Sequence, residues 1–145
     1  MAHILVFEPD KNQRLLVAEE LQNHGHFVRA VATVQEAIAS VELFTPDVAI
    51  VEVATSDVPG PRLLGRLLGA NPRLPVVVHT GNSRCMGETL AALVDSCVLK
   101  SSNLWPLVAA VHRVLRRAKL SAEPWGAAQL PVSGHPQQAC TLAPH

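Results

Sequence analysis

Five short runs of apolar residues recur along the chain, and each is too short to form a helix. They are rich in β-branched side chains, and several lack the alternation of apolar and polar residues seen in half-exposed strands. Continuous apolar runs of this length are typical of parallel strands whose sheet is covered by helices on both faces. The predicted strands are residues 3–7, 27–30, 48–53, 76–79 and 97–99.

The segments between these runs carry the end signals of helices. Asp10 is placed to cap a helix over residues 11–23, and Gly25 follows where a left-handed residue would end it. Thr33 and Glu36 have the spacing of a capping box. Further helices are predicted over residues 61–68 and 85–94 and from Asn103 onward. The alternation of strands and helices predicts an α/β protein with a doubly wound, five-stranded parallel sheet.

The pattern changes towards the carboxyl end of the chain. Residues 120–145 hold four prolines and two glycines but no periodic apolar face. We therefore expect one domain over residues 1–119 and a flexible, Pro-rich tail over residues 120–145. The tail is too short to form an effector domain.

Composition narrows the function classes. Of the 145 residues 48% are hydrophobic, and the mean hydropathy is +0.21, which excludes a chain that is disordered overall. Basic and acidic residues number 12 each, so no global charge favours binding to nucleic acid or to an anionic membrane. The three cysteines form no CxxC pair, and no apolar run approaches the ~20 residues of a membrane span. We expect a cytoplasmic protein without a signal peptide.

Polar residues stand at the ends of four predicted strands. Glu8 and Asp10 follow the first strand, Glu52 lies near the end of the third, Thr80 follows the fourth and Lys100 follows the fifth. If the sheet has the flavodoxin-like (βα)5 order 2-1-3-4-5, these side chains converge at one edge, beside the point where the strand order reverses. Two acids, a hydroxyl and an ammonium then share one site.

This constellation resembles the receiver domain of response regulators, the CheY-like family. The resemblance covers about residues 2–117 and rests on the stretches ILVFEPD, PDVAIVEVATSDVPG, VVVHTG and SCVLKSS. The spacings of 44 residues from Glu8 to Glu52 and 28 from Glu52 to Thr80 are those of the family. The resemblance implies the strand order 2-1-3-4-5 and a role in two-component, phosphorelay-type signal transduction.

The resemblance also implies a phospho-accepting Asp and a metal-binding acidic pair, and here the chain departs from the pattern. Glu52 occupies the phosphoacceptor position, and Pro9 replaces the second residue of the acidic pair, so Glu8 and Asp10 alone remain as the acidic pocket. Magnesium needs oxygen ligands in near-octahedral geometry, and Pro9 provides none. The side chain of Glu52 is one methylene longer than that of aspartate, which displaces its reacting oxygen, and a displacement of ~1 Å can cost ~100-fold in rate. We therefore expect Mg²⁺ binding to be lost or weak, with no other metal or cofactor.

The groups that contact the phosphoryl group in the family are retained. Thr80 and Lys100 match the switch hydroxyl and the phosphate-binding lysine, although 20 residues separate them, about two fewer than in the family. Cys97 stands at the aromatic switch position. The longer carboxylate of Glu52 is expected to accept hydrogen bonds from Thr80 and an ion pair from Lys100. An alternative is that Glu52 is only a counter-ion of Lys100.

We interpret the chain as a pseudo-receiver, not an enzyme, that acts through protein–protein interaction independently of phosphorylation. The resemblance implies a partner face made by the fourth helix, the fifth strand and the fifth helix, binding a second copy, a histidine kinase or an effector. The candidate residues on it are Leu104, Trp105, His112, Arg113 and Arg116. The alternatives are a phosphorylatable single-domain receiver in a phosphorelay and, disfavoured by the net charge of zero, a binder of acidic lipid or nucleic acid through the basic helix.

Three further histidines have alternative interpretations. His24 and His26 form an HxH pair that could ligate a metal, but two ligands in a turn without a third favour solvated loop histidines. His79 ends the fourth predicted strand and either titrates near the site or is a plain strand-end residue.

Overall fold

The computed structural model describes residues 1–55, 58–82 and 87–122. The chain divides into two compact units, Met1–Leu115 and Arg116–His145, and the sheet lies in the first. The described strands are β1 His3–Phe7, β2 Phe27–Val31, β3 Val48–Val51, β4 Val76–Thr80 and β5 Ser96–Leu99. The described helices are α1 Lys11–Asn23, α2 Val34–Phe44, α3 Gly60–Ala70, α4 Glu88–Leu93 and α5 Trp105–Ala122. None of these helices combines the length and apolar character needed to cross a bilayer.

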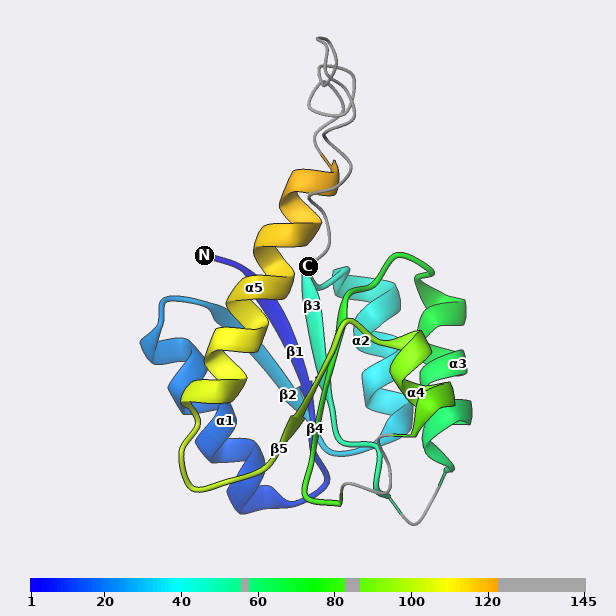
Figure 1. Cartoon of the computed structure of the whole chain (residues 1–145), viewed down its shortest axis with the longest axis horizontal. Helices are drawn as coiled ribbons and strands as arrows, with labels where there is room; N and C mark the ends of the chain where they lie inside the picture. Colours follow the sequence, from blue (N-terminus) through cyan, green and yellow to red (C-terminus); the bar gives the residue numbers. More distant parts are fainter. Residues whose placement is uncertain (56–57, 83–86, 123–145) are drawn as a thin grey trace, which may run out of the picture. The chain divides into compact units, whose positions relative to one another are not determined.

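The five strands form one parallel sheet in the order β2-β1-β3-β4-β5, which confirms the predicted fold class (Figure 1). In the register of the sheet, Phe7 lies opposite Val51, and Val78 lies between Val51 and Cys97. The carboxyl ends of the strands therefore face the same edge. Because the order reverses beside β1, the loops after β1 and β3 diverge there and leave room for a site.

Helices cover both faces of the sheet, with α1 and α5 on one side and α2, α3 and α4 on the other (Figure 1). Successive residues of a strand point to opposite faces, so Val77 packs towards α1 and α5 while Val76 and Val78 pack towards the other layer. Both layers are apolar, which explains why the strand sequences are continuous hydrophobic runs.

The predicted helix ends are confirmed. The carboxylate of Asp10 accepts a hydrogen bond from the N–H of Gln13 at 2.9 Å and caps α1. Gly25 has φ of +88°, a left-handed conformation that favours glycine. The capping box of Thr33 and Glu36 starts α2.

Other boundaries differ from the prediction. Helix α3 continues through Gly69 and ends at Ala70, with Asn71 as its C-cap directly before Pro72. Helix α5 runs to Ala122, past the predicted domain boundary at residue 119. The rest of the predicted tail, and the predicted start of the fourth helix at Cys85, lie outside the described residues.

Candidate functional site

The carboxyl edge of the sheet carries the polar residues predicted for it. Glu8 directly follows β1, Glu52 follows β3, Thr80 ends β4 and Lys100 follows β5. Backbone hydrogen bonds continue the sheet here, from the N–H of Glu52 to the carbonyl of Phe7 at 3.1 Å and from that of Lys100 to the carbonyl of Thr80 at 2.8 Å. The positions of these side chains are therefore set by the sheet itself.

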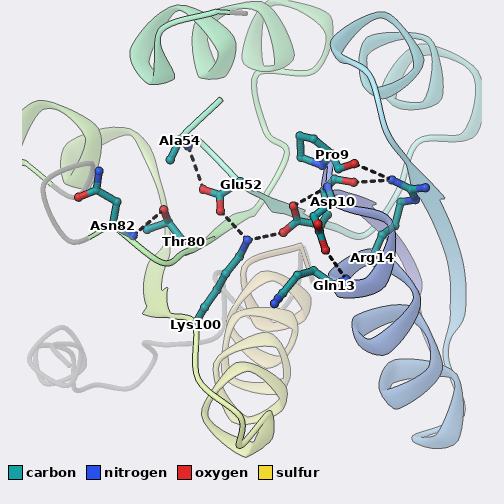
Figure 2. Close-up of polar contacts among 10 residues, drawn as sticks. Pro9, Asp10, Gln13, Arg14, Glu52, Ala54, Thr80, Asn82 and Lys100 are labelled. Atoms are coloured by element: carbon teal, nitrogen blue, oxygen red, sulfur yellow. Dashed lines mark hydrogen bonds and ion pairs between the residues drawn. The ribbon is translucent and has the colours of Figure 1, made fainter. Parts of the chain in front are cut away.

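The structure brings Lys100 between two acidic side chains. Its Nζ lies 2.5 Å from Oε1 of Glu8 and 2.6 Å from Oε1 of Glu52. The other oxygen of each carboxylate accepts a backbone hydrogen bond, from Asp10 to Glu8 at 3.0 Å and from Ala54 to Glu52 at 2.9 Å (Figure 2). All four carboxylate oxygens thus have a partner.

This ion triad of Glu8, Glu52 and Lys100 is nearly buried. The side chains of Glu8 and Glu52 are 6% and 8% exposed, and that of Lys100 is 18% exposed. Charges at such depth are tolerated only when they are paired and hydrogen-bonded. With all three groups ionised the triad has a formal charge of −1.

The ammonium keeps its proton in this setting. Burial acts to lower the pKa of Lys100, but the hydrogen bonds and charges of Glu52 and Glu8 outweigh it. The pKa of Lys100 therefore lies above its ordinary value of 10.5. The positive charge between the carboxylates is permanent at physiological pH.

The second predicted acid of the pocket, Asp10, has its carboxylate at the start of α1, where it caps the helix through Gln13. Only its backbone N–H reaches Glu8. Arg14, which the sequence analysis did not single out, donates from Nη1 to the carbonyl of Glu8 at 2.8 Å and to that of Pro9 at 3.2 Å (Figure 2). Arg14 thereby holds the turn between β1 and α1; its place one turn into that helix is the only signal the sequence offers.

The retained hydroxyl and the switch position lie apart from the triad contacts. Oγ1 of the fully buried Thr80 accepts a hydrogen bond from the N–H of Asn82 at 3.3 Å, and in the described residues it makes none with Glu52. Cys97 packs against the core beneath α2, α3 and α4. Burial raises the pKa of the Cys97 thiol, which is therefore neutral.

His79 is buried beside the triad, with 4% of its surface exposed. Burial and the charge of Lys100 lower its pKa to about 4, and the opposite effect of Glu52 is smaller. His79 is therefore a neutral imidazole at pH 7 and adds no charge to the site.

Among the residues predicted for a partner face, Trp105 is 61% exposed, and Arg113 and Arg116 are also exposed. Leu99, at the end of the edge strand β5, is 51% exposed and was missed by the sequence analysis. A leucine that closes an apolar run gives no sign of its exposure, because that depends on β5 being the outermost strand.

The other two residues of the predicted face turn inwards. Leu104 is partly buried and packs against the core beneath α1 and α5. His112 is partly buried, and its Nε2 lies 2.9 Å from Nε2 of His26.

In the described residues no group of three or more His, Cys, Asp or Glu side chains is arranged to hold a metal ion. At the triad, the cation between the two carboxylates is the ammonium of Lys100.

Comparison with known proteins agrees with this architecture. PhoP of Salmonella typhimurium, a virulence transcriptional regulatory protein, is 29% identical over 119 residues, covering 81% of this chain and 53% of PhoP. The chain thus spans about half the length of this relative. NtrX from Brucella abortus is 26% identical with a TM-score of 0.77, over 89% of this chain and 29% of that one.

A second solved structure, TrrA from Thermotoga maritima in complex with Mg²⁺ and BeF, shares the fold, with a TM-score of 0.73 and 24% identity over 79% of this chain and 99% of TrrA. The family model of the response regulator receiver domain matches residues 4–112, which include β2 to β5 and all of β1 except His3. On this match, the chain belongs to the response regulator receiver domain family of two-component signalling.

Proposed function

We propose that this receiver acts without phosphorylation, as a non-enzymatic module that signals through protein–protein contact. The observation that carries the proposal is the position of Lys100, whose ammonium bridges Glu8 and Glu52.

The donor set fits Mg²⁺ poorly. The ion requires near-octahedral oxygen ligands at about 2.0–2.1 Å. The oxygens of Glu8 and Glu52 already have partners, and the ammonium lies between them. Pro9 offers no side-chain oxygen, and the carboxylate of Asp10 is engaged at the start of α1. A divalent cation would have to displace Lys100 and break the triad, so no step of the proposed mechanism uses a metal.

Glu52 is also poorly placed as a nucleophile. Its Oε1 is paired with Lys100 and its Oε2 accepts the N–H of Ala54. An attack on a phosphoryl donor would require one of these contacts to break in a nearly buried site. Phosphorylation at this position would therefore be slow even with a donor present.

The same contacts support a constitutive state. In the family a phosphoryl group draws the hydroxyl and the lysine inward; here Lys100 is held by carboxylates alone while Thr80 stays with Asn82. One carboxylate carries about half the charge of a phosphoryl group. We infer that Glu52 shifts the receiver only partly towards the arrangement that a phosphoryl group produces. It holds Lys100 as that group would, but it does not draw in the hydroxyl of Thr80.

The proposed output surface is the face made by α4, β5 and α5. Exposed Leu99 and Trp105 provide apolar and aromatic area, and the exposed Arg113 adds positive charge. Trp and Arg are enriched in the energetically dominant parts of interfaces. The proposed partner is a second copy, an effector or a histidine kinase; TrrA was solved in complex with the histidine kinase ThkA, which supports a kinase as one such partner.

Intact-mass spectrometry after incubation with acetyl phosphate and Mg²⁺ tests the proposal. The wild-type chain should gain no phosphoryl group, whereas the double variant Pro9→Asp/Glu52→Asp should gain one, because both metal-ligand positions become aspartate. The single variant Glu52→Asp is the matched control and should react less than the double variant. An adduct on Glu52 of the wild type would overturn the proposal in favour of a phosphorylatable receiver in a phosphorelay.

A further inference from the structure

A second polar cluster lies at the amino edge of the sheet. His24 and His26 flank Gly25 between α1 and β2, and His112, 86 residues after His26, reaches them from α5. Helices α1 and α5 cover the same face of the sheet (Figure 1). The ring of His112 lies 5.1 Å from that of His26 and 5.7 Å from that of His24, measured between centroids.

Hydrogen bonds determine which nitrogen carries each proton. The backbone N–H of Ala2 donates to Nδ1 of His26 at 3.1 Å, so in the neutral ring the proton of His26 is on Nε2. That nitrogen lies 2.9 Å from Nε2 of His112, which must then be the acceptor, with its own proton on Nδ1. A chain of hydrogen bonds thus runs from Ala2, the residue before β1, through the turn to α5.

The same chain argues against metal binding. A metal would need the lone pairs of both Nε2 atoms, but Nε2 of His26 keeps its proton as long as Nδ1 accepts from Ala2. Two nitrogens bound tetrahedrally to one zinc at about 2.0–2.1 Å also lie about 3.3 Å apart, farther than the 2.9 Å seen here. The cluster is built to bind protons.

One additional proton breaks the chain wherever it binds. If the proton binds to Nε2 of His112, that nitrogen can no longer accept the N–H of His26, and two N–H groups face each other. If it binds to Nδ1 of His26, the N–H of Ala2 loses its acceptor. Other titratable groups face the pair: the amino group of Met1 and, from α1, His24, whose Nε2 lies 3.2 Å from Oε2 of Glu20. Burial, followed by His112, the Met1 amino group and His24, lowers the pKa of His26 below 6.5.

We propose that the contact between His26 and His112 is a proton-sensitive link, which ties α5 to the α1–β2 turn and to β1 while both rings are neutral and opens when the pair takes up a proton. Opening separates His112 from His26 and so removes this contact between the α1–β2 turn and α5, the helix that also carries Trp105 and Arg113. The link does not depend on how the triad functions, so its failure would leave the proposed function untouched.

The test is an NMR titration of the full chain, using long-range ¹H–¹⁵N correlations of the imidazoles. At alkaline pH, His26 should carry its proton on Nε2 and His112 on Nδ1. As the pH falls below 6.5, both rings should become protonated together, and the Ala2 amide should exchange with solvent several-fold faster than its intrinsic pH dependence explains. Independent titration of the two rings with a protected Ala2 amide would overturn the proposal.

Two variants sharpen this experiment. His112→Gln removes the titrating partner and should raise the pKa of His26 towards its ordinary value. His3→Gln is the matched control, because His3 is exposed and stacks on Phe27 outside the cluster, so the titration of His26 should not change. An unchanged titration of His26 in His112→Gln would refute the link, and the wild-type titration decides the question even if that variant does not fold.

Discussion

The two edges of the sheet hold polar clusters of opposite character. At the carboxyl edge, Glu8, Glu52 and Lys100 form a nearly buried triad of full charges. At the amino edge, His26 and His112 form a chain of neutral hydrogen bonds that starts at a backbone N–H. Both clusters connect elements that are distant in sequence.

The difference lies in what can change each cluster. The pKa of Lys100 lies above 10.5, so its ammonium keeps its charge at physiological pH. A change of pH within the physiological range therefore leaves the triad unaltered, whereas a change of the residue at position 52 alters it. Burial, followed by the neighbouring His112, lowers the pKa of His26 below its ordinary value of 6.5, so this ring takes up its proton only as the pH falls. The carboxyl edge therefore keeps a fixed charge, whereas the proposed link at the amino edge responds to pH.

The largest effect is expected from Lys100→Met, which leaves Glu8 and Glu52 facing each other without a counter-ion. Removing one partner of a buried ion pair costs about 3 kcal/mol or more of stability. Urea denaturation should therefore show a loss of this order. The matched control is the same change in a Glu8→Gln/Glu52→Gln background, where the loss should fall below about 1 kcal/mol; equal losses in both backgrounds would refute the charge argument.

Acid should destabilise the protein through His79. Its pKa is about 4 when folded and 6.5 when unfolded, so the unfolded chain binds more protons between these values. The contribution is fully present above pH 6.5 and is lost as the pH falls towards 4, with about 2 kcal/mol gone by pH 5. His26 acts in the same direction, because its pKa is also lowered. His79→Gln should flatten the pH dependence of the free energy of unfolding, and an unchanged slope would contradict the assignment.

Glu52→Gln keeps the shape of the side chain and removes its charge. Lys100 then retains Glu8 alone, and the loss of one charge-assisted hydrogen bond should weaken the constitutive bias by about 1–2 kcal/mol. We expect partner binding to weaken several-fold, the amide resonances of Thr80 and Asn82 to shift and the fold to persist. If neither binding nor these resonances change, Glu52 is only a counter-ion of Lys100.

The smallest effect is expected at the amino edge from Glu20→Gln. The contact between Glu20 and His24 is exposed on both sides, and such pairs contribute about 0.5 kcal/mol or less. Stability should hardly change, and the joint titration of His26 and His112 should persist. If that joint titration disappears, the proton sensitivity arises from the exposed carboxylate.

The order of strands and helices was predicted correctly because the residues at the ends of each segment and its apolar pattern agree with its place in the fold. The apolar runs of the strands reflect burial on both faces, and Asp10, Gly25 and Thr33 mark helix ends through their own chemistry. Helix α3 exceeded its prediction because Gly69 tolerates a helical backbone, so a glycine alone did not end the helix.

The site was predicted only in part. The ion pair of Glu52 with Lys100 follows from their strand ends and is present, whereas the expected hydrogen bond from Thr80 to Glu52 is replaced by contacts of Thr80 with Asn82 and of Glu52 with Ala54. These depend on backbone N–H groups that sequence spacing does not position.

The amino-edge cluster was missed for a related reason. The sequence offers His24 and His26 as a pair, and nothing local indicates that His112 on α5 packs against them. That contact exists because α1 and α5 cover the same face of the sheet, a property of the topology and not of either segment.

The most direct test of the central claim is a Mg²⁺ titration of the full chain, with and without beryllofluoride, followed by the amide resonances of Ala54, Asn82 and Lys100. If the ammonium of Lys100 occupies the place of the metal, these resonances should show no saturable shift below high-millimolar Mg²⁺, and beryllofluoride should add none. Saturable binding at micromolar Mg²⁺, accompanied by release of Lys100 from Glu8 and Glu52, would contradict the account.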